Sequence, residues 1–268
     1  MKTNTSELNV VAIIQARLSS SRLPGKVLLD IAGKPMLTRV VERANLAKSI
    51  NSTVVATTTD SSDDAIVELC ELEGYHWYRG SQFDVLDRYY QAAREFQAQM
   101  IVRITADCPV IDPIVIDKTV YALVDYMHTN PDRAQPGFSA NRLPPPWGRT
   151  YPVGLDTEVC TFAGLELVWK EARLPHQREH VMPFFYENPG RFNIIHVNHE
   201  RDFGYLRWTV DTPEDLELIR QIYSRFPGRV DFSWLGILDL IEREPKLLNI
   251  NAQVQPKDYR QVDERRIQ

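Results

Sequence analysis

The sequence predicts an α/β fold in which helices cover both faces of a mostly parallel sheet. The apolar run at 10–14 is typical of a buried strand, and the run at 53–58 is rich in β-branched residues. Amphipathic stretches with capping residues lie between successive strands, which is typical of βαβ units. We therefore expect a three-layer, Rossmann-like mixed sheet whose first half is doubly wound.

The other elements follow from local patterns in chain order. We expect strands at 10–14, 53–58, 76–79, 100–104, 137–140, 155–160, 192–197 and 206–210. Helices are expected at 35–44, 61–74, 83–96, 113–127, 162–171 and 177–186, followed by a final helix after Asp211. In that helix Thr212 suits the N-cap, Pro213 the first helical position, and Asp215 completes a capping box.

A length of 268 residues allows one large α/β domain or two small ones. We expect a single domain at 8–243, with a loop or arm inserted at about 130–158 and a polar tail at 244–268. Proline and glycine gather in the insertion, and loops of this length are usually lids, binding loops or arms that contact a partner. A floppy surface insertion is the alternative.

Composition excludes several classes of protein. The formal net charge of −5 argues against a general nucleic-acid or anionic-membrane binder, so we expect neither as a partner. The cysteines Cys70, Cys108 and Cys160 are far apart, which argues against a disulfide framework or zinc ribbon. The polar N-terminus lacks a signal peptide's apolar core, and no apolar run reaches the roughly 20 residues of a membrane span. We expect a cytoplasmic protein.

A cationic loop follows the first predicted strand. It holds Arg17, Arg22 and Lys26 together with the serines at 19–21, so backbone N–H groups, hydroxyls and cations can point at one anion. It is not a Walker loop, because only Gly25 and Lys26 match and a valine replaces the Ser or Thr that would reach magnesium. It also lacks G-x-G-x-x-G. Taken alone, its cations could be ordinary surface charges.

Two aspartates give the loop a possible counterpart. Asp107 and Asp211 each sit at the predicted carboxyl end of a strand, the edge where open α/β sheets bind ligands. Two carboxylates beside a phosphate loop can hold Mg²⁺, a hard ion that favours carboxylate and phosphate oxygens. Each Asp alone is equally well explained as a helix-terminus charge. The combination with the loop favours a metal site.

Longer stretches carry a resemblance to a known family. The stretch IIQARLSSSRLPGKVLLDIAGKPML resembles the opening of CMP-sugar synthetases, which include the ketodeoxyoctonate and acylneuraminate cytidylyltransferases. The stretches YRGSQFDVLDRYYQAA, VRITADCPVIDP, TYPVGLDTEV, REHVMPFFYENP and LRWTVDTPEDLELIR resemble the branch called spore coat polysaccharide biosynthesis protein F. The resemblance covers about 10–226, nearly the whole chain.

The resemblance implies a glycosyltransferase-A-like nucleotidyltransferase fold. It also implies a reaction of CTP with a sugar or sugar-like acid, giving a CMP-sugar and pyrophosphate for surface polysaccharide synthesis. By this resemblance, Asp107 and Asp211 match the magnesium-binding aspartates. Arg17, Arg22 and Lys26 match the loop that grips the triphosphate, and Arg22 and Lys26 are the catalytic candidates beside the two aspartates. Thr105 stands where the ketodeoxyoctonate enzymes carry a Gln that helps to read cytosine. The nucleotide-binding candidates are Ala16, Arg17, Ser19, Arg22, Lys26, Asp84 and Thr105.

The acceptor-binding candidates lie in the second half of the chain. Asp156 and Glu158 alternate on a predicted strand and so face one side, toward the acceptor or toward solvent. Glu179 and His180 either bind acceptor hydroxyls or stabilise a helix. The full set is Asn141, Tyr151, Asp156, Glu158, Glu179 and His180. For Asp84, an exposed i,i+4 pair with Arg88 is the alternative to a role in the base pocket.

Two other functions remain open from the sequence. One is a glycosyltransferase that uses a preformed nucleotide sugar on the same kind of fold. The other is a non-catalytic nucleotide-binding protein. By resemblance we also expect a homodimer that forms through 130–158.

Overall fold

The computed structural model describes residues 8–131, 135–255 and 262. Its strands are β1 Val10–Gln15, β2 Asp30–Ile31, β3 Lys34–Pro35, β4 Ser52–Thr58, β5 His76–Gly80, β6 Met100–Thr105, β7 Gly137–Ala140, β8 Glu158–Thr161 and β9 Asn193–His196. Its α-helices are α1 Met36–Ala44, α2 Asp64–Glu73, α3 Val85–Glu95, α4 Pro113–Thr129, α5 Phe162–Glu171, α6 Pro175–His180, α7 Pro183–Glu187, α8 Pro213–Ser224 and α9 Trp234–Arg243. The short 3-10 helices are η2 Lys26–Leu28, η3 Ser61–Asp63 and η4 Pro245–Asn249.

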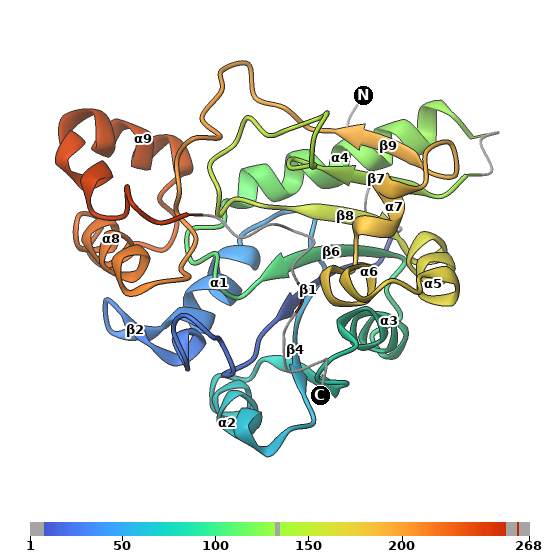
Figure 1. Ribbon diagram of the computed structural model, residues 1–268, viewed down its shortest axis with the longest axis horizontal. Coiled ribbons are helices and arrows are strands. Elements are labelled where there is room, and N and C mark those ends of the chain that lie inside the picture. The colour runs from blue at the N-terminus through green and yellow to red at the C-terminus, as the bar shows by residue number, and fades with distance from the viewer. Residues whose placement is uncertain (1–7, 132–134, 256–261, 263–268) are drawn as a thin grey trace.

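A seven-stranded sheet with the order β5-β4-β1-β6-β8-β7-β9 forms the centre of the molecule (Figure 1). Strands β5, β4, β1 and β6 are parallel, whereas β8 runs antiparallel to both β6 and β7, and β9 is parallel to β7. The mixed α/β sheet predicted from the sequence is thus confirmed. Because the chain leaves β1 toward β4 and later returns to β6 on the other side, a topological switch point lies between β1 and β6.

Successive residues of β1 enter two different apolar clusters. Val10, Ala12 and Ile14 pack with residues of α1, α4, α8 and α9, whereas Val11 and Ile13 pack with residues of α3 and α5. Both faces of the strand are therefore buried, which explains its uninterrupted apolar sequence. Figure 1 shows α1, α8 and α9 on one side of the central strands and α3, α5 and α6 on the other.

The segment 206–210 is not the strand that we predicted. It makes a single isolated bridge between Val153 and Arg207, through bonds from Val153 N to Leu206 O (2.8 Å) and from Trp208 N to Val153 O (2.7 Å). Its apolar residues Leu206, Trp208 and Val210 are buried as a strand's would be, but the partner is a loop rather than the sheet. The strand expected at 155–160 is likewise shorter and begins at Glu158.

Two helix predictions also need correction. The helix expected at 177–186 is divided into α6 and α7, because Val181 has a φ of 70° and Pro183 opens a new helix. The helix after Asp211, with the predicted capping box of Thr212 and Asp215, is confirmed, but it is not the final one. Helix α9 follows it, capped by Ser233, whose side chain accepts from Gly236 N.

The C-terminal part of the described chain packs against the domain. Leu247 of η4 belongs to the same apolar cluster as α8 and α9, and Asn251 is 7% exposed. The boundary at 243 and 244 and the arm at about 130–158 remain predictions. No helix in the described ranges is both long and apolar enough to cross a bilayer.

Gly154 is where the long loop before β8 meets the segment that leads to Asp211. Its φ is +109°, and a Cβ added there would lie 2.6 Å from the carbonyl carbon of Trp208 and 2.7 Å from Thr209 N. Only a residue without a side chain permits this close approach of two backbones.

We expect Gly154→Ala to lower the free energy of unfolding by about 2 to 4 kcal/mol, since it combines backbone strain with an overlap against backbone atoms. Gly148→Ala is the matched control, because Gly148 also has a positive φ (+78°) but has nothing within 4 Å of the added Cβ. It should cost only the backbone strain, about 1 to 2 kcal/mol. Equal losses for the two variants in urea-induced unfolding would contradict the packing argument.

Candidate active site

The candidate site lies at the switch point, at the carboxyl ends of β1 and β6. Backbone bonds hold its segments in place. Ala106 N donates to Gln15 O (3.1 Å) and Val210 N to Asp107 O (2.8 Å), while Ala16 N donates to Ala56 O of β4 (3.1 Å). The loop after β1, the end of β6 and the segment before α8 are therefore held side by side. The predicted proximity of Asp107 and Asp211 to the cationic loop follows from these bonds.

The loop after β1 is anchored by Asp63 of η3. The buried carboxylate of Asp63 accepts from Leu18 N (2.7 Å) and from the hydroxyl of Thr58. Leu18 O in turn accepts from Gly25 N (2.8 Å), and Gly25, with a φ of 69°, turns the chain into η2. The loop thus has a fixed path, and it delivers Lys26 into the interior of the site.

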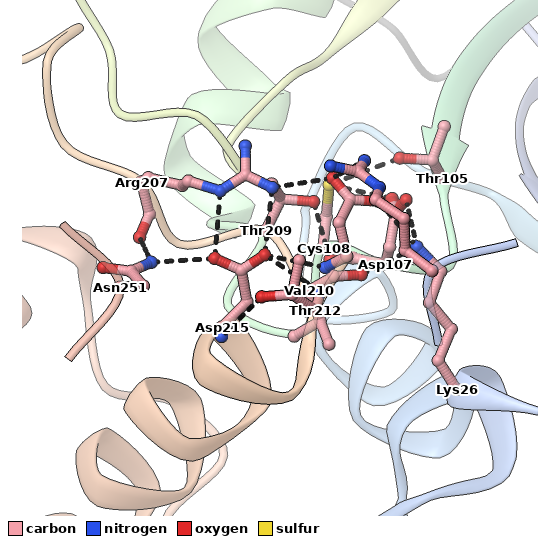
Figure 2. Close-up of polar contacts among 12 residues, drawn as sticks. Lys26, Thr105, Asp107, Cys108, Arg207, Thr209, Val210, Thr212, Asp215 and Asn251 are labelled. Atoms are coloured by element: carbon pink, nitrogen blue, oxygen red, sulfur yellow. Dashed lines mark hydrogen bonds and ion pairs between the residues drawn. The ribbon is translucent and has the colours of Figure 1, made fainter. Parts of the chain in front are cut away.

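The ammonium of Lys26 lies between the two predicted aspartates. Its Nζ donates to Asp107 Oδ2 (2.9 Å), Asp211 Oδ1 (3.0 Å) and Val210 O (2.7 Å) (Figure 2). The side chain of Lys26 is only 10% exposed. Burial alone would lower the pKa of Lys26, but the two carboxylates outweigh burial, so the pKa is raised and the ammonium stays charged.

Asp211 has cations on both of its oxygens. Besides Lys26 on Oδ1, Arg22 Nη2 (2.9 Å) and Arg207 Nη2 (2.7 Å) contact Oδ2. Burial works to raise the pKa of Asp211, but Lys26, Arg207 and Arg22 together lower it to about 2. Asp211 is therefore an anion at neutral pH.

The donor chemistry of this cluster fits a magnesium ion on one condition. Asp107 and Asp211 offer hard oxygen donors that already share one cation at 2.9 and 3.0 Å. Within the described ranges no group of three or more His, Cys, Asp or Glu side chains is placed to hold a metal. A metal would need phosphate oxygens or water as its other ligands, the usual arrangement for Mg²⁺.

Thr105 and Cys108 lie beside Asp107. The hydroxyl of Thr105, the last residue of β6, is 3.3 Å from the Sγ of Cys108, which is itself 3.6 Å from Asp107 Oδ1. Burial and the nearby carboxylates of Asp107 and Asp156 raise the pKa of the Cys108 thiol well above its usual range. Cys108 is therefore a neutral, packed thiol at pH 7 rather than a nucleophile.

A second charged cluster contains the candidates Asp156 and Glu158. Asp156 accepts from Arg149 Nη1 (2.7 Å) and Nη2 (3.1 Å), and Arg142 Nε lies 3.8 Å away. Glu158, nearly fully buried, pairs with Arg103 across the β6–β8 ladder. Burial would raise the pKa of Asp156, but Arg149 and Arg142 outweigh it and lower the pKa. Glu158 is thus shielded from solvent, whereas the side chain of Asp156 is 26% exposed.

Asn141 and Tyr151 are both 1% exposed. The amide of Asn141 donates to Leu155 O (2.7 Å) and accepts from Thr157 N (2.9 Å), which fixes the base of the loop before β8. The ring of Tyr151 packs against Trp234, with the ring centres 5.4 Å apart. Their role in binding the acceptor remains a prediction, and a structural role accounts for both contacts.

The remaining candidates lie around α3 and α6. Asp84 caps α3 by accepting from Asp87 N and pairs with Arg178 of α6 (3.0 Å to Nε and 2.5 Å to Nη2). The exposed pair of Asp84 and Arg88 is therefore wrong, because Arg88 is only 1% exposed. Glu179 and His180, half-buried, end α6. Arg17 and Ser19 are half-buried in the loop after β1.

Several residues of these clusters were not singled out from the sequence: Arg103, Arg142, Arg149, Arg207 and Asn251. Arg103 had a usable signal, since a cation within an apolar strand needs a buried partner. Arg207 and Asn251 had none, because their partner Asp215 is identified only by the fold.

A family model described as "Cytidylyltransferase" matches residues 11–226. A solved cytidylyltransferase structure from Leptospira borgpetersenii superposes with a TM-score of 0.81 at 33% identity, covering 94% of this chain and 100% of that one. The spore coat polysaccharide biosynthesis protein SpsF of Bacillus subtilis is 28% identical, covering 88% of this chain and 95% of its own. A 3-deoxy-manno-octulosonate cytidylyltransferase of Solibacter usitatus is 29% identical, covering 80% of this chain and 94% of its own.

Proposed function

Because the chain belongs to the cytidylyltransferase family, we propose that it transfers CMP from CTP to a sugar or sugar-like acid, with release of pyrophosphate, in surface polysaccharide biosynthesis. The observation that carries the proposal is the ammonium of Lys26 shared by Asp107 and Asp211 at the switch point. The site supplies the cations Arg22 and Lys26 to bind a triphosphate, and the carboxylates of Asp107 and Asp211 to bind a metal ion. The cytoplasmic location expected from the sequence remains a prediction.

In this reaction an acceptor oxygen attacks the α-phosphorus of CTP. A new P–O bond forms, the bond from the α-phosphorus to the bridging oxygen breaks, and the electron pair leaves with pyrophosphate while the acceptor loses its proton. Arg22 and Lys26 stabilise the negative charge that grows on the leaving group, and the anchored loop aligns the triphosphate. Bound Mg²⁺ would be held by Asp107 and Asp211 and would supply a Lewis acid for the α-phosphate.

We assign the nucleotide to the residues around Asp107 and the acceptor to the charged cluster around Asp156. The nucleotide-binding candidates at the end of β6 and in the loop after β1 are Ala16, Arg17, Ser19 and Thr105. Asp84 lies at the start of α3. In the acceptor cluster, the side chains of Arg142 and Arg149 are 26% and 21% exposed. Both contact the carboxylate of Asp156, so two positive charges meet one negative charge. Partly exposed guanidinium groups suit an acceptor that carries a carboxylate. The acid in the name of the Solibacter relative supports that assignment.

Pyrophosphate release is the direct test. With CTP, Mg²⁺ and a panel of sugar acids, we expect pyrophosphate to form, and Asp107→Ala or Asp211→Ala should lower turnover by at least about 100-fold because each removes a metal ligand. Asp117→Asn is the control, because Asp117 lies away from the site, where its carboxylate accepts from Ser49 N (2.8 Å). Release of a nucleoside diphosphate from a preformed nucleotide sugar would favour the glycosyltransferase. CTP binding with no turnover would favour a non-catalytic protein.

Lys26 makes metal binding depend on the nucleotide. Its ammonium holds the carboxylate oxygens that a metal would use, so a second cation is repelled until phosphate draws Lys26 away. We expect Mn²⁺, followed by its EPR signal, to bind weakly without nucleotide and tightly with CTP. Lys26→Gln removes the charge and should strengthen binding of Mn²⁺ alone by about tenfold or more, roughly 1.4 kcal/mol. Unchanged Mn²⁺ affinity in the variant would refute a site between Asp107 and Asp211.

We further propose a homodimer that forms through the insertion at about 130–158. Trp147 in this insertion is 43% exposed, and Tyr205 is 75% exposed. The loop of Tyr205 lies against the insertion, because a Cβ on Gly204 would meet the Arg149 side chain at 2.8 Å. Two large exposed aromatic residues on adjoining loops are typical of an interface core.

Sedimentation tests the dimer. The wild-type chain should sediment as a dimer, and Trp147→Ser combined with Tyr205→Ser should shift it toward the monomer, because aromatic anchors carry much of an interface's energy. Leu72→Ser, at an 82% exposed position on α2, is the control and should remain dimeric. A wild-type monomer at micromolar concentration would remove this proposal and leave the reaction untouched.

A further inference from the structure

The position of Asp211 is not set by the sheet. The segment 206–210 is held by its bridge to Val153 and by the bond from Val210 N to Asp107 O (2.8 Å). These bonds fix the backbone but leave the direction of the Asp211 carboxylate to side-chain contacts. Besides Lys26 on Oδ1 and Arg22 on Oδ2, Arg207 makes such a contact, also on Oδ2.

Arg207 links Asp211 to a second carboxylate, that of Asp215. Its Nη2 donates to Asp211 Oδ2 (2.7 Å) and to Asp215 Oδ2 (3.0 Å), and its Nε donates to Asp215 Oδ1 (2.9 Å). The fork of two parallel bonds to Asp215 fixes the plane of the guanidinium. One edge of that fixed plane then holds Asp211.

Asp215 is a rigid anchor for this fork. It is fully buried in the first turn of α8, and its Oδ2 also accepts from Asp211 N (3.0 Å) and Thr212 N (3.2 Å). A buried carboxylate is stable only when donors surround it, and these donors leave it little freedom to turn. The capping box of α8 and the orientation of Arg207 thus depend on one side chain.

Asn251 closes the network from outside the region that the family model matches. Its Nδ2 donates to Asp215 Oδ1 (2.9 Å) and to the backbone carbonyl Arg207 O (3.1 Å), so it ties the Asp215 carboxylate to the main chain of Arg207 (Figure 2). Asn251 reaches this position through α9 and η4, whose residues Trp234 and Leu247 are anchored in the core. The matched region ends at 226.

We propose that Arg207 is a positioning residue for Asp211 and that Asn251 supports it, so that the segment after 226 completes the active site. Arg207 acts through Asp211: with Arg22 it holds Oδ2, which leaves Oδ1 to the ammonium that Asp107 also contacts. The inference rests on the proposed role of Asp211 in nucleotidyl transfer.

Arg207→Lys tests the first half of the proposal, because Lys keeps the charge but lacks the fork. We expect kcat to fall by about 10- to 100-fold, the usual effect of losing a residue that orients a metal ligand. The affinity for Mn²⁺ in the presence of CTP, measured by EPR without acceptor, should fall by a similar factor. The KM for CTP should stay within about twofold, since the charge is retained.

Asn251→Ala tests the second half, with Asn9→Ala as its matched control. The amide of Asn9 also makes two bonds, to Phe96 O (3.0 Å) and Gln97 O (3.0 Å), but at the opposite edge of the sheet. Both variants should lower the melting temperature to a similar degree. Only Asn251→Ala should lower kcat and the Mn²⁺ affinity, by about tenfold.

Three results would count against the proposal in different ways. A raised KM for CTP with unchanged kcat in Arg207→Lys would make Arg207 a direct phosphate ligand instead. Identical behaviour of Asn251→Ala and Asn9→Ala would show that Asn251 contributes stability alone. Failure of the wild-type protein to bind Mn²⁺ with CTP would reject the proposed function, and the inference with it, whichever variant is used.

Discussion

The ammonium of Lys26 is the contact on which the rest of the site depends. It joins the loop after β1, the end of β6 and the segment before α8, which are far apart in the chain. Asp107 and Asp211 each lie within 3.0 Å of Lys26 Nζ, and the two carboxylates would repel each other without this cation. The buried ammonium would in turn be unstable without acceptors. Each charge is therefore held in place by the others, and the polar interior needs all three.

The strands and helices near the site were largely predictable, because β1, β4 and β6 are continuous apolar or β-branched runs and α8 carries its cap in the sequence. The segment 206–210 was mistaken for a strand, since a buried extended segment has the same pattern whether it pairs with a sheet or a loop. The break at Val181 and the missed α9 differ in kind: the positive φ of Val181 has no sequence signal, whereas Ser233 and the apolar spacing after it do.

The positions of Asp107 and Lys26 could be predicted from the rule that ligands bind at the carboxyl edge of a sheet. The charged pairs around them could not, because Arg207 meets Asp215 and Arg103 meets Glu158 only after the chain has folded. Cys108 is linked to both charged clusters, because the carboxylates of Asp107 and Asp156 each help to raise the pKa of its thiol. The side chain of Cys108 is small and neutral, so it adds no charge to either cluster.

The antiparallel direction of β8 has a consequence for how such a protein can change during evolution. Because β7 is parallel to β6 and β8 runs opposite to both, the connection from β7 to β8 begins and ends at the same edge of the sheet as the site. It is in effect a long hairpin loop, and its length can vary without moving a strand. New acceptors can then be recruited by remodelling this loop, while the half of the molecule that handles the nucleotide is inherited unchanged.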